Sequence, residues 1–154
     1  MFDRFLPSSR NRNNVAVFVD GPNMIRKEFD IDLDDLREAA EALGTLKVAK
    51  VFLNQYASEK LVEAIISQGF EPELGLGGQK DRDSDVDVYM AVQAMDAVYN
   101  DRIDTIALVT RDTDFLPVIQ RAKELGKKTV ILGVEEGLST ALGNAADKKV
   151  IIES

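Results

Sequence analysis

Four aspartates in three separate segments carry the most specific chemical signal in this sequence. Asp20 directly follows the apolar run Val15–Val19. Asp87 lies early in a long segment of helical periodicity, and Asp112 and Asp114 follow a second apolar run. The sequence holds no histidine and no cysteine, which excludes histidine general bases, thiolate nucleophiles and the usual zinc sites. Any chemistry therefore depends on carboxylates, hydroxyls, amines or bound ions.

Carboxylates that converge need either protons or a cation between them. Two like charges about 4 Å apart cost on the order of 4 kcal/mol at an effective dielectric constant of about 20. Oxygen ligands without histidine favour Mg²⁺ or Mn²⁺ over zinc, and Mg²⁺ keeps several waters, which leaves room for a phosphate oxygen. Two such ions about 3.5–4 Å apart could activate a water and stabilise the leaving oxygen in phosphodiester hydrolysis.

The elements that must position these aspartates alternate between strands and helices. Strands are expected over 15–19, 47–53, 70–74, 105–110, 129–132 and 150–152. Helices are expected over 33–43, 58–69, 85–100, 112–125 and 138–146. This alternation predicts an α/β fold with a mostly parallel sheet covered by helices on both faces. Ligand sites in such sheets lie at the carboxyl ends of the strands, where the strand order reverses, so all four aspartates should reach one edge.

Each acidic segment also has an ordinary structural explanation. Asp-Gly-Pro-Asn is a good turn sequence, and either Asp112 or Asp114 is a suitable helix N-cap. The alternating aspartates between residues 81 and 87 fit a solvated surface, and Asp85 falls on a different helical face from Asp87. A site is favoured because three segments, far apart in sequence, reach the same edge of the predicted sheet.

Length and charge restrict the class of protein. The 154 residues are enough for one domain, and we expect a mobile N-terminal arm over 1–13 and a single domain over 14–154. Asp and Glu number 27 against 19 Lys and Arg, a net charge of −8, which argues against a purely electrostatic nucleic-acid binder. The sequence shows neither a membrane-length apolar run nor a signal peptide, so we expect a cytoplasmic protein that makes no contact with membranes.

Three motifs, in this order and spacing, resemble the NYN domain of the PIN-like nucleases, and in particular a group of archaeal proteins of that family. They are Val-Ala-Val-Phe-Val-Asp20-Gly-Pro-Asn23, then Asp85-Val-Asp87-Val, then Leu-Val-Thr110-Arg-Asp112-Thr-Asp114-Phe115. The tail Leu138-Ser-Thr-Ala-Leu142, with Ala146-Asp147, also fits. The resemblance covers roughly residues 14 to 152.

The resemblance implies a three-layer PIN-like fold with strand order 3-2-1-4-5 and a metal-dependent ribonuclease that uses Mg²⁺ or Mn²⁺ to cut RNA. It places Asp20, Asp87, Asp112 and Asp114 at catalytic and metal-binding positions. Asn23 would orient a water or a phosphate. PIN-like domains often pair, so the resemblance also implies a homodimer.

Further residues are candidates for substrate binding. They are Lys80 in the loop before the Asp87 helix, the hydroxyls of Thr110 and Thr113, and Arg111 beside Asp112. The glycine-rich stretch from Gly75 lacks the Gly-Lys-Ser/Thr ending of a nucleotide-binding P-loop, which excludes that type of site.

Two departures from the family pattern keep other functions open. Gln93 stands where many relatives have a further acid, and Thr110-Arg111 stands where many have Ser-Gly. The alternative is a catalytically weakened or inactive RNA-binding or regulatory module of the same fold. Asp112-Thr-Asp114 also resembles the Asp-x-Asp of haloacid-dehalogenase phosphatases, but that motif ends the first strand of its fold.

Overall fold

The computed structural model describes residues 13–24, 32–75 and 84–152, apart from the side chains of Asn23, Ser84 and Asp85. The predicted arm therefore lies outside the described residues except for Asn13, whose carbonyl accepts a hydrogen bond from the Thr45 amide (2.8 Å). Lys80 lies outside them as well.

The described residues form a sheet of six strands, all parallel to their neighbours. The strands are β1 (Asn14–Asp20), β2 (Thr45–Asn54), β3 (Glu71–Gly75), β4 (Thr105–Val109), β5 (Lys128–Gly133) and β6 (Lys148–Ile151). Their order is β3-β2-β1-β4-β5-β6. This confirms the order implied by the resemblance, and β6 extends the sheet beyond β5.

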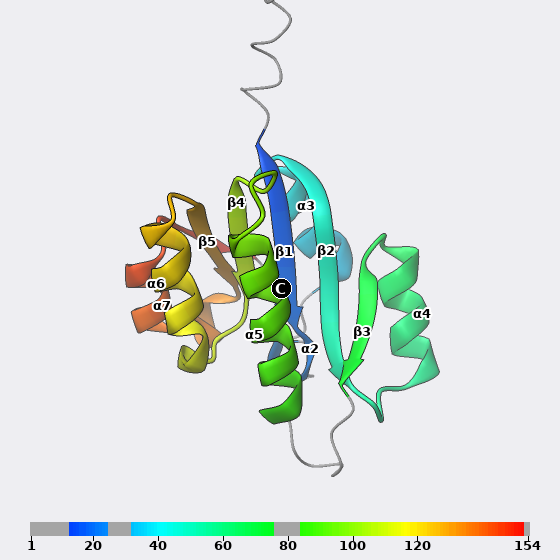
Figure 1. The fold of residues 1–154 in the computed structure, drawn as a ribbon. Coiled ribbons are helices and arrows are strands. Elements are labelled where there is room, and N and C mark those ends of the chain that lie inside the picture. Colours follow the sequence, from blue (N-terminus) through cyan, green and yellow to red (C-terminus); the bar gives the residue numbers. More distant parts are fainter. Residues whose placement is uncertain (1–12, 25–31, 76–83, 153–154) are drawn as a thin grey trace, which may run out of the picture.

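Helices cover both faces of the sheet (Figure 1). They are α2 (Gly21–Met24), α3 (Leu33–Glu41), α4 (Glu59–Ser67), α5 (Ser84–Val98), α6 (Leu116–Glu124) and α7 (Thr140–Ala145), with the 3-10 turns η2 (Thr113–Phe115) and η3 (Glu135–Gly137). Residues of α3 and α4 share one hydrophobic cluster with the sheet, and residues of α5, α6 and α7 share the other. The three-layer α/β architecture predicted from the sequence is confirmed.

The central strands are apolar on both faces because both faces are covered. Val17 of β1 packs into the cluster of α3 and α4, whereas Phe18 packs into the cluster of α5 and α6. Each such side chain contributes about 1.5–3 kcal/mol through burial. Buried on both sides, β1 and β4 hold their carboxyl ends in fixed positions at the middle of the sheet.

The helix ends follow local sequence signals. Asp32 accepts a hydrogen bond from the Asp34 amide at the start of α3, and Ser58 accepts one from the Leu61 amide at the start of α4, as N-caps do. Gly69 and Gly126 follow α4 and α6 with φ of 86° and 82°, a conformation that glycine adopts without strain.

Two predicted segments differ from the structure. The Asp-Gly-Pro-Asn segment does end β1, but its last three residues belong to the short helix α2. The helix predicted over 112–125 begins instead as the 3-10 turn η2 and becomes α-helical at Leu116. Pro117 lies in the first turn of α6, where its missing N–H is tolerated.

Candidate metal centre at the carboxyl edge of the sheet

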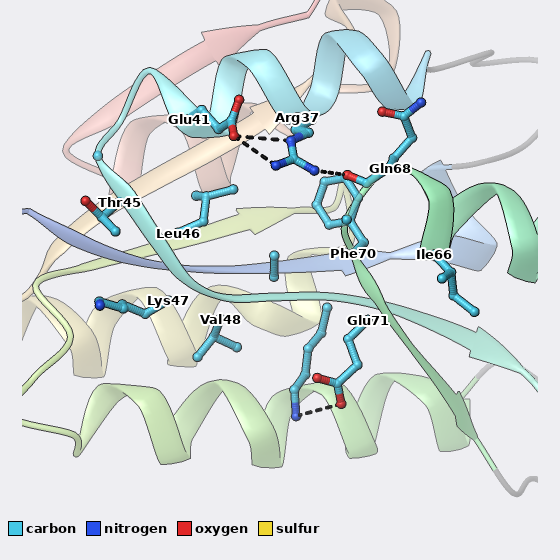
Figure 2. Close-up of a pocket in the computed structure, with 14 residues that line it drawn as sticks. Arg37, Glu41, Thr45, Leu46, Lys47, Val48, Ile66, Gln68, Phe70 and Glu71 are labelled. Carbon is cyan, nitrogen blue, oxygen red and sulfur yellow. Dashed lines mark hydrogen bonds and ion pairs between the residues drawn. The ribbon is translucent and has the colours of Figure 1, made fainter.

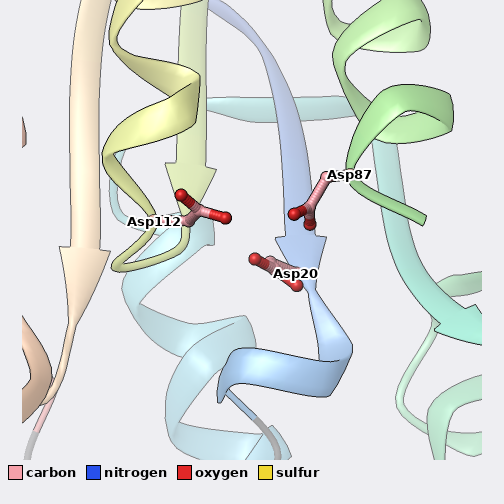
Figure 3. Close-up of side chains that lie close together, drawn as sticks. All are labelled: Asp20, Asp87 and Asp112. Atoms are coloured by element: carbon pink, nitrogen blue, oxygen red, sulfur yellow. The ribbon is translucent and has the colours of Figure 1, made fainter. Parts of the chain in front are cut away.

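The pairing of β1 with β4 brings Asp20 and Asp112 together although they are 92 positions apart in sequence. Val19 pairs with Val109, so the two strands end side by side. Asp20 is the last residue of β1 and is 0% exposed. Asp112 follows β4 and is half-buried. The strand order that sequence analysis assumed therefore places both carboxylates at one edge of the sheet (Figure 3).

Asp87 completes the group from α5. Val86 and Met90 of the same helix are buried against the sheet. The first turn of α5 therefore lies beside the end of β1, and Asp87 points toward Asp20 (Figure 3). One carboxylate oxygen each from Asp20, Asp87 and Asp112 lies within 4.8 Å of the other two. The structure thus brings together three of the four predicted aspartates.

The environment of Asp87 disfavours its negative charge. Burial raises the pKa of Asp87 to about 8, helped by the charge of Asp20, a hydrogen bond with Asp112, and the charges of Asp112 and Asp114. Its Oδ1 atom is buried and has no hydrogen-bond partner among the described residues. A buried oxygen without a partner is costly in a folded protein, so this atom has an unused capacity to bind a ligand.

Thr110 links the two strand ends beneath the cluster. Its buried hydroxyl donates to Asp20 Oδ2 (2.8 Å) and accepts from the Asp112 amide (3.1 Å). Both bonds lie between groups fixed by the strands, so Thr110 restricts where the two carboxylates point. A contact between Thr110 and a substrate remains a prediction.

Gly21 is required by the close approach of α2 to β2. A Cβ atom at this position would collide with the Phe52 carbonyl oxygen and lie 2.6 Å from Leu53 Cδ2. The residue after Asp20 must therefore be glycine for the chain to leave β1 in this direction. This contact explains the glycine of the Asp-Gly-Pro-Asn segment better than turn propensity alone.

Asp114 and Thr113 lie in η2 and are exposed. The Asp114 amide donates to Asp112 Oδ1 (2.9 Å), so Asp112 caps η2 and faces the cluster at the same time. The carboxylate of Asp114 is not part of the three-oxygen group, but its charge helps raise the pKa of Asp87. Its role as a direct ligand stays a prediction.

Gln93, which departs from the family pattern, contacts a different group of side chains. It accepts a hydrogen bond from Lys50 Nζ (2.6 Å) and donates one to Glu73 Oε1 (3.5 Å). Lys50 also pairs with Glu73 (3.4 Å), and Tyr89 Oη donates to Glu73 (2.5 Å). The side chain at position 93 therefore fastens α5 to β2 and β3, and none of its described contacts is with the three aspartates.

The aspartate group matches the requirements of a hard divalent cation. Mg²⁺ binds oxygens at about 2.0–2.1 Å, so ligands on opposite sides of the ion are roughly 4.2 Å apart. Adjacent ligands are roughly 2.9 Å apart, so three oxygens within 4.8 Å of one another would have to draw closer to share one ion, which side-chain movements allow. A cation bound here could also be contacted by Asp87 Oδ1, which has no hydrogen-bond partner among the described residues.

Another pocket lies away from the aspartate group. It has a volume of about 780 Å³ and follows the first half of β2 beside α3 and the turn before β3 (Figure 2). These residues of β2 pair with the start of β1, away from Asp20. The acids of this pocket form ion pairs, Glu41 with Arg37 (3.1 Å) and Glu71 with Lys50 (3.9 Å). Their charges are therefore compensated by neighbouring side chains and do not require a metal ion.

A smaller pocket adjoins the aspartates. It has a volume of about 290 Å³ and is lined by Arg111, Asp112, Glu136, Gly137 and Leu138. Sequence analysis had singled out Arg111 but had missed Glu136, because η3 follows β5 and only the pairing of β4 with β5 brings the two together. Asp112 belongs to both the pocket and the aspartate group.

No helix in the described part of the chain is long and apolar enough to cross a membrane.

Comparison with known proteins supports the family suggested by the motifs. An uncharacterised protein of Methanocaldococcus jannaschii is 54% identical over 138 residues, which cover 90% of this chain and 55% of that protein. The chain thus spans about half the length of this relative. A crystal structure of a protein of unknown function from Vibrio parahaemolyticus superposes with a TM-score of 0.80 over 93% of this chain and 94% of that one, at 22% identity, and shares the fold. The family model of the NYN domain matches residues 14–153, and the chain therefore belongs to the NYN domain family.

Proposed function

We propose that this protein is a ribonuclease that depends on Mg²⁺ or Mn²⁺ and hydrolyses RNA phosphodiester bonds at the aspartate group. The observation that carries the proposal is the convergence of Asp20, Asp87 and Asp112 from three elements, with one oxygen of each within 4.8 Å of the other two. Membership of a family with a nuclease-like fold supports it.

The three aspartates would hold the cation, and Thr110 would keep Asp20 and Asp112 oriented toward it. When bound, a divalent cation supplies positive charge at the scissile phosphate and makes water a better nucleophile near neutral pH. Asp87, whose pKa is raised to about 8, must lose its proton for the site to bind the ion fully. Asp114, which is exposed in η2 two residues after Asp112, would hold a water by hydrogen bonding.

Arg111 lines the pocket next to Asp112, where its guanidinium can bind a phosphate of the substrate through two parallel hydrogen bonds. A cation at this position helps a chain with a net charge of −8 to accept a polyanion. The roles of Asn23, Lys80 and Thr113 in substrate binding belong to the same proposal.

The test is cleavage of a 5′-labelled single-stranded RNA with Mn²⁺, with Mg²⁺ and with EDTA. We expect cleavage with either ion, products with a 5′-phosphate, and no cleavage in EDTA. Asp112→Asn should abolish cleavage while thermal unfolding stays cooperative. Asp96→Asn removes an exposed acid of α5 and should leave cleavage unchanged. Cleavage that persists in EDTA would contradict the role of the metal.

The alternative is an RNA-binding module of the same fold that does not cleave RNA. Because the net charge is −8, such a module would bind RNA through a few well-placed cations such as Arg111. Calorimetry separates the two functions. A module of this kind binds RNA with similar affinity in Mn²⁺ and in EDTA, whereas the nuclease needs the ion to neutralise its aspartates.

A further inference from the structure

We infer that Glu136 recognises a ribose 2′-hydroxyl and makes the site selective for RNA over DNA. This inference rests on the proposed function and assigns a role to the pocket of about 290 Å³ beside Asp112. The pocket opens next to the aspartate group, so a nucleotide whose phosphate lies at Asp112 would place its sugar or base there.

The position of Glu136 is fixed by the end of β5. Val109 of β4 pairs with Leu132 of β5, so the two strands end at the same edge of the sheet. The turn η3 begins two residues after β5, and the Gly137 amide donates to the Val134 carbonyl (3.2 Å). Leu138 then packs on the hydrophobic cluster below. Glu136 is thus presented on a short, anchored turn.

Glu136 and Arg111, which both line this pocket, suit different parts of a nucleotide. A carboxylate repels phosphates, so near a bound nucleic acid Glu136 is favourable only where it faces a hydrogen-bond donor. The sugar of RNA offers such a donor in its 2′-hydroxyl, and DNA has none at that position. Arg111, on the opposite element of the same pocket, suits the phosphate. A sugar–phosphate unit satisfies both.

A base amino group is the other donor that Glu136 could face, and the experiment separates the two. Uracil has no exocyclic amino group, so a short oligouridylate is used with the matching oligodeoxyuridylate and with an oligouridylate carrying single 2′-deoxy substitutions. Cleavage is measured with Mn²⁺, and binding is measured with Ca²⁺ by fluorescence anisotropy. The matched variants are Glu136→Gln and Glu135→Gln, since Glu135 is a neighbouring exposed acid that does not line the pocket.

We expect Glu136→Gln to reduce the preference for RNA over DNA about tenfold, because a neutral amide oxygen accepts a weaker hydrogen bond from the 2′-hydroxyl than a carboxylate does. Cleavage and binding of the deoxy oligonucleotide should not fall, because the variant removes a charge that repels phosphates, and Glu135→Gln should keep the wild-type preference for RNA. One particular 2′-deoxy substitution should reproduce the defect, and combining it with Glu136→Gln should add nothing further. Mn²⁺ affinity should be the same in both variants.

Two results would overturn the inference. One is an equal effect of Glu136→Gln on the ribo- and deoxy-oligonucleotides, and the other is an equal effect of Glu135→Gln. The binding arm keeps this test separate from catalysis. If the wild type binds RNA but does not cut it, the nuclease proposal fails, while the preference for ribose in Ca²⁺ still decides the role of Glu136.

Discussion

Two groups of half-buried charges lie along α5, and they differ in how their charges are balanced. In one group, Glu73 receives a hydrogen bond from Tyr89 and a salt bridge from Lys50. Burial alone would raise the pKa of Glu73, but these contacts outweigh it and hold the pKa below its usual value. In the other group, burial and three neighbouring carboxylates raise the pKa of Asp87 to about 8.

This difference distinguishes a structural brace, the Lys50 group, from a binding site, the aspartate group. The Lys50 group has both signs of charge and needs nothing more to be stable. The aspartate group gathers carboxylates, and the raised pKa of Asp87, about 8, means that this residue keeps a proton at neutral pH when no ligand is bound. A cation that replaces this proton gives the second group the balance that Lys50 gives the first.

The largest expected effect is that of removing a carboxylate from the aspartate group. Asp20→Asn should lower Mn²⁺ affinity more than about 100-fold, because even residues that only support metal ligands contribute 10–100-fold. Isothermal titration calorimetry measures the affinity, with Asp96→Asn as the control on a neighbouring exposed acid. Equal affinities in the wild type and Asp20→Asn would show that Asp20 is not a ligand.

Removing the lysine from the Lys50 group should instead destabilise the fold. Lys50→Met leaves Glu73, with its side chain 16% exposed, without its charge partner. We expect a loss of about 1–3 kcal/mol in the free energy of unfolding, measured by urea denaturation. Glu71→Gln, which alters a more exposed partner of Lys50, should cost much less. If Lys50→Met is as stable as the wild type, the brace is not needed.

Thr110→Val tests how the aspartate group is positioned. Valine keeps the volume of threonine and removes the hydroxyl that joins Asp20 to the Asp112 amide. We expect Mn²⁺ affinity to fall about tenfold, the lower end of the effect of supporting residues. Thr110→Ser keeps the hydroxyl and should restore most of the affinity. A defect of equal size in both variants would point to packing rather than to the hydrogen bonds.

The last expected effect is a dependence of stability on pH in the absence of metal. The folded-state pKa of Asp87 is about 8, above its unfolded value of 3.8, so between these values the folded state holds a proton that the unfolded state has released. The contribution of Asp87 to stability is therefore greatest below about pH 4 and falls as the pH rises toward 8.

Urea denaturation in EDTA at pH 5, 6.5 and 8 measures this contribution. Asp87→Asn removes the titration, so the difference in stability between the variant and the wild type should move in favour of the variant as the pH rises. A difference that stays constant over this range would mean that Asp87 is already ionised at pH 5.

The sequence was sufficient to predict the main features of the fold and of the site. The resemblance to the family implied the strand order, and the rule that parallel strands share a carboxyl edge predicted that Asp20, Asp87 and Asp112 converge. The caps at Asp32 and Ser58 are of a kind that local signals can predict, because a cap depends only on residues within one turn.

Other features depend on contacts that no local pattern encodes. The bond between Lys50 and Gln93 joins residues 43 positions apart, and the pocket with Glu136 exists because η3 follows a strand beside β4. For the same reason, Asp112 could be read as a cap or as a ligand, whereas the structure gives it the cap contact and a place in the aspartate group.

The central claim is that the three aspartates form one site for a divalent cation. Titration of the metal-free protein with Mn²⁺, followed by electron paramagnetic resonance at pH 6.5 and pH 8, tests it most directly. We predict saturable binding that is several-fold tighter at pH 8, because Asp87 gives up its proton on binding, and that is lost in Asp20→Asn. Binding that is absent, or that is unchanged by Asp20→Asn, would contradict the claim.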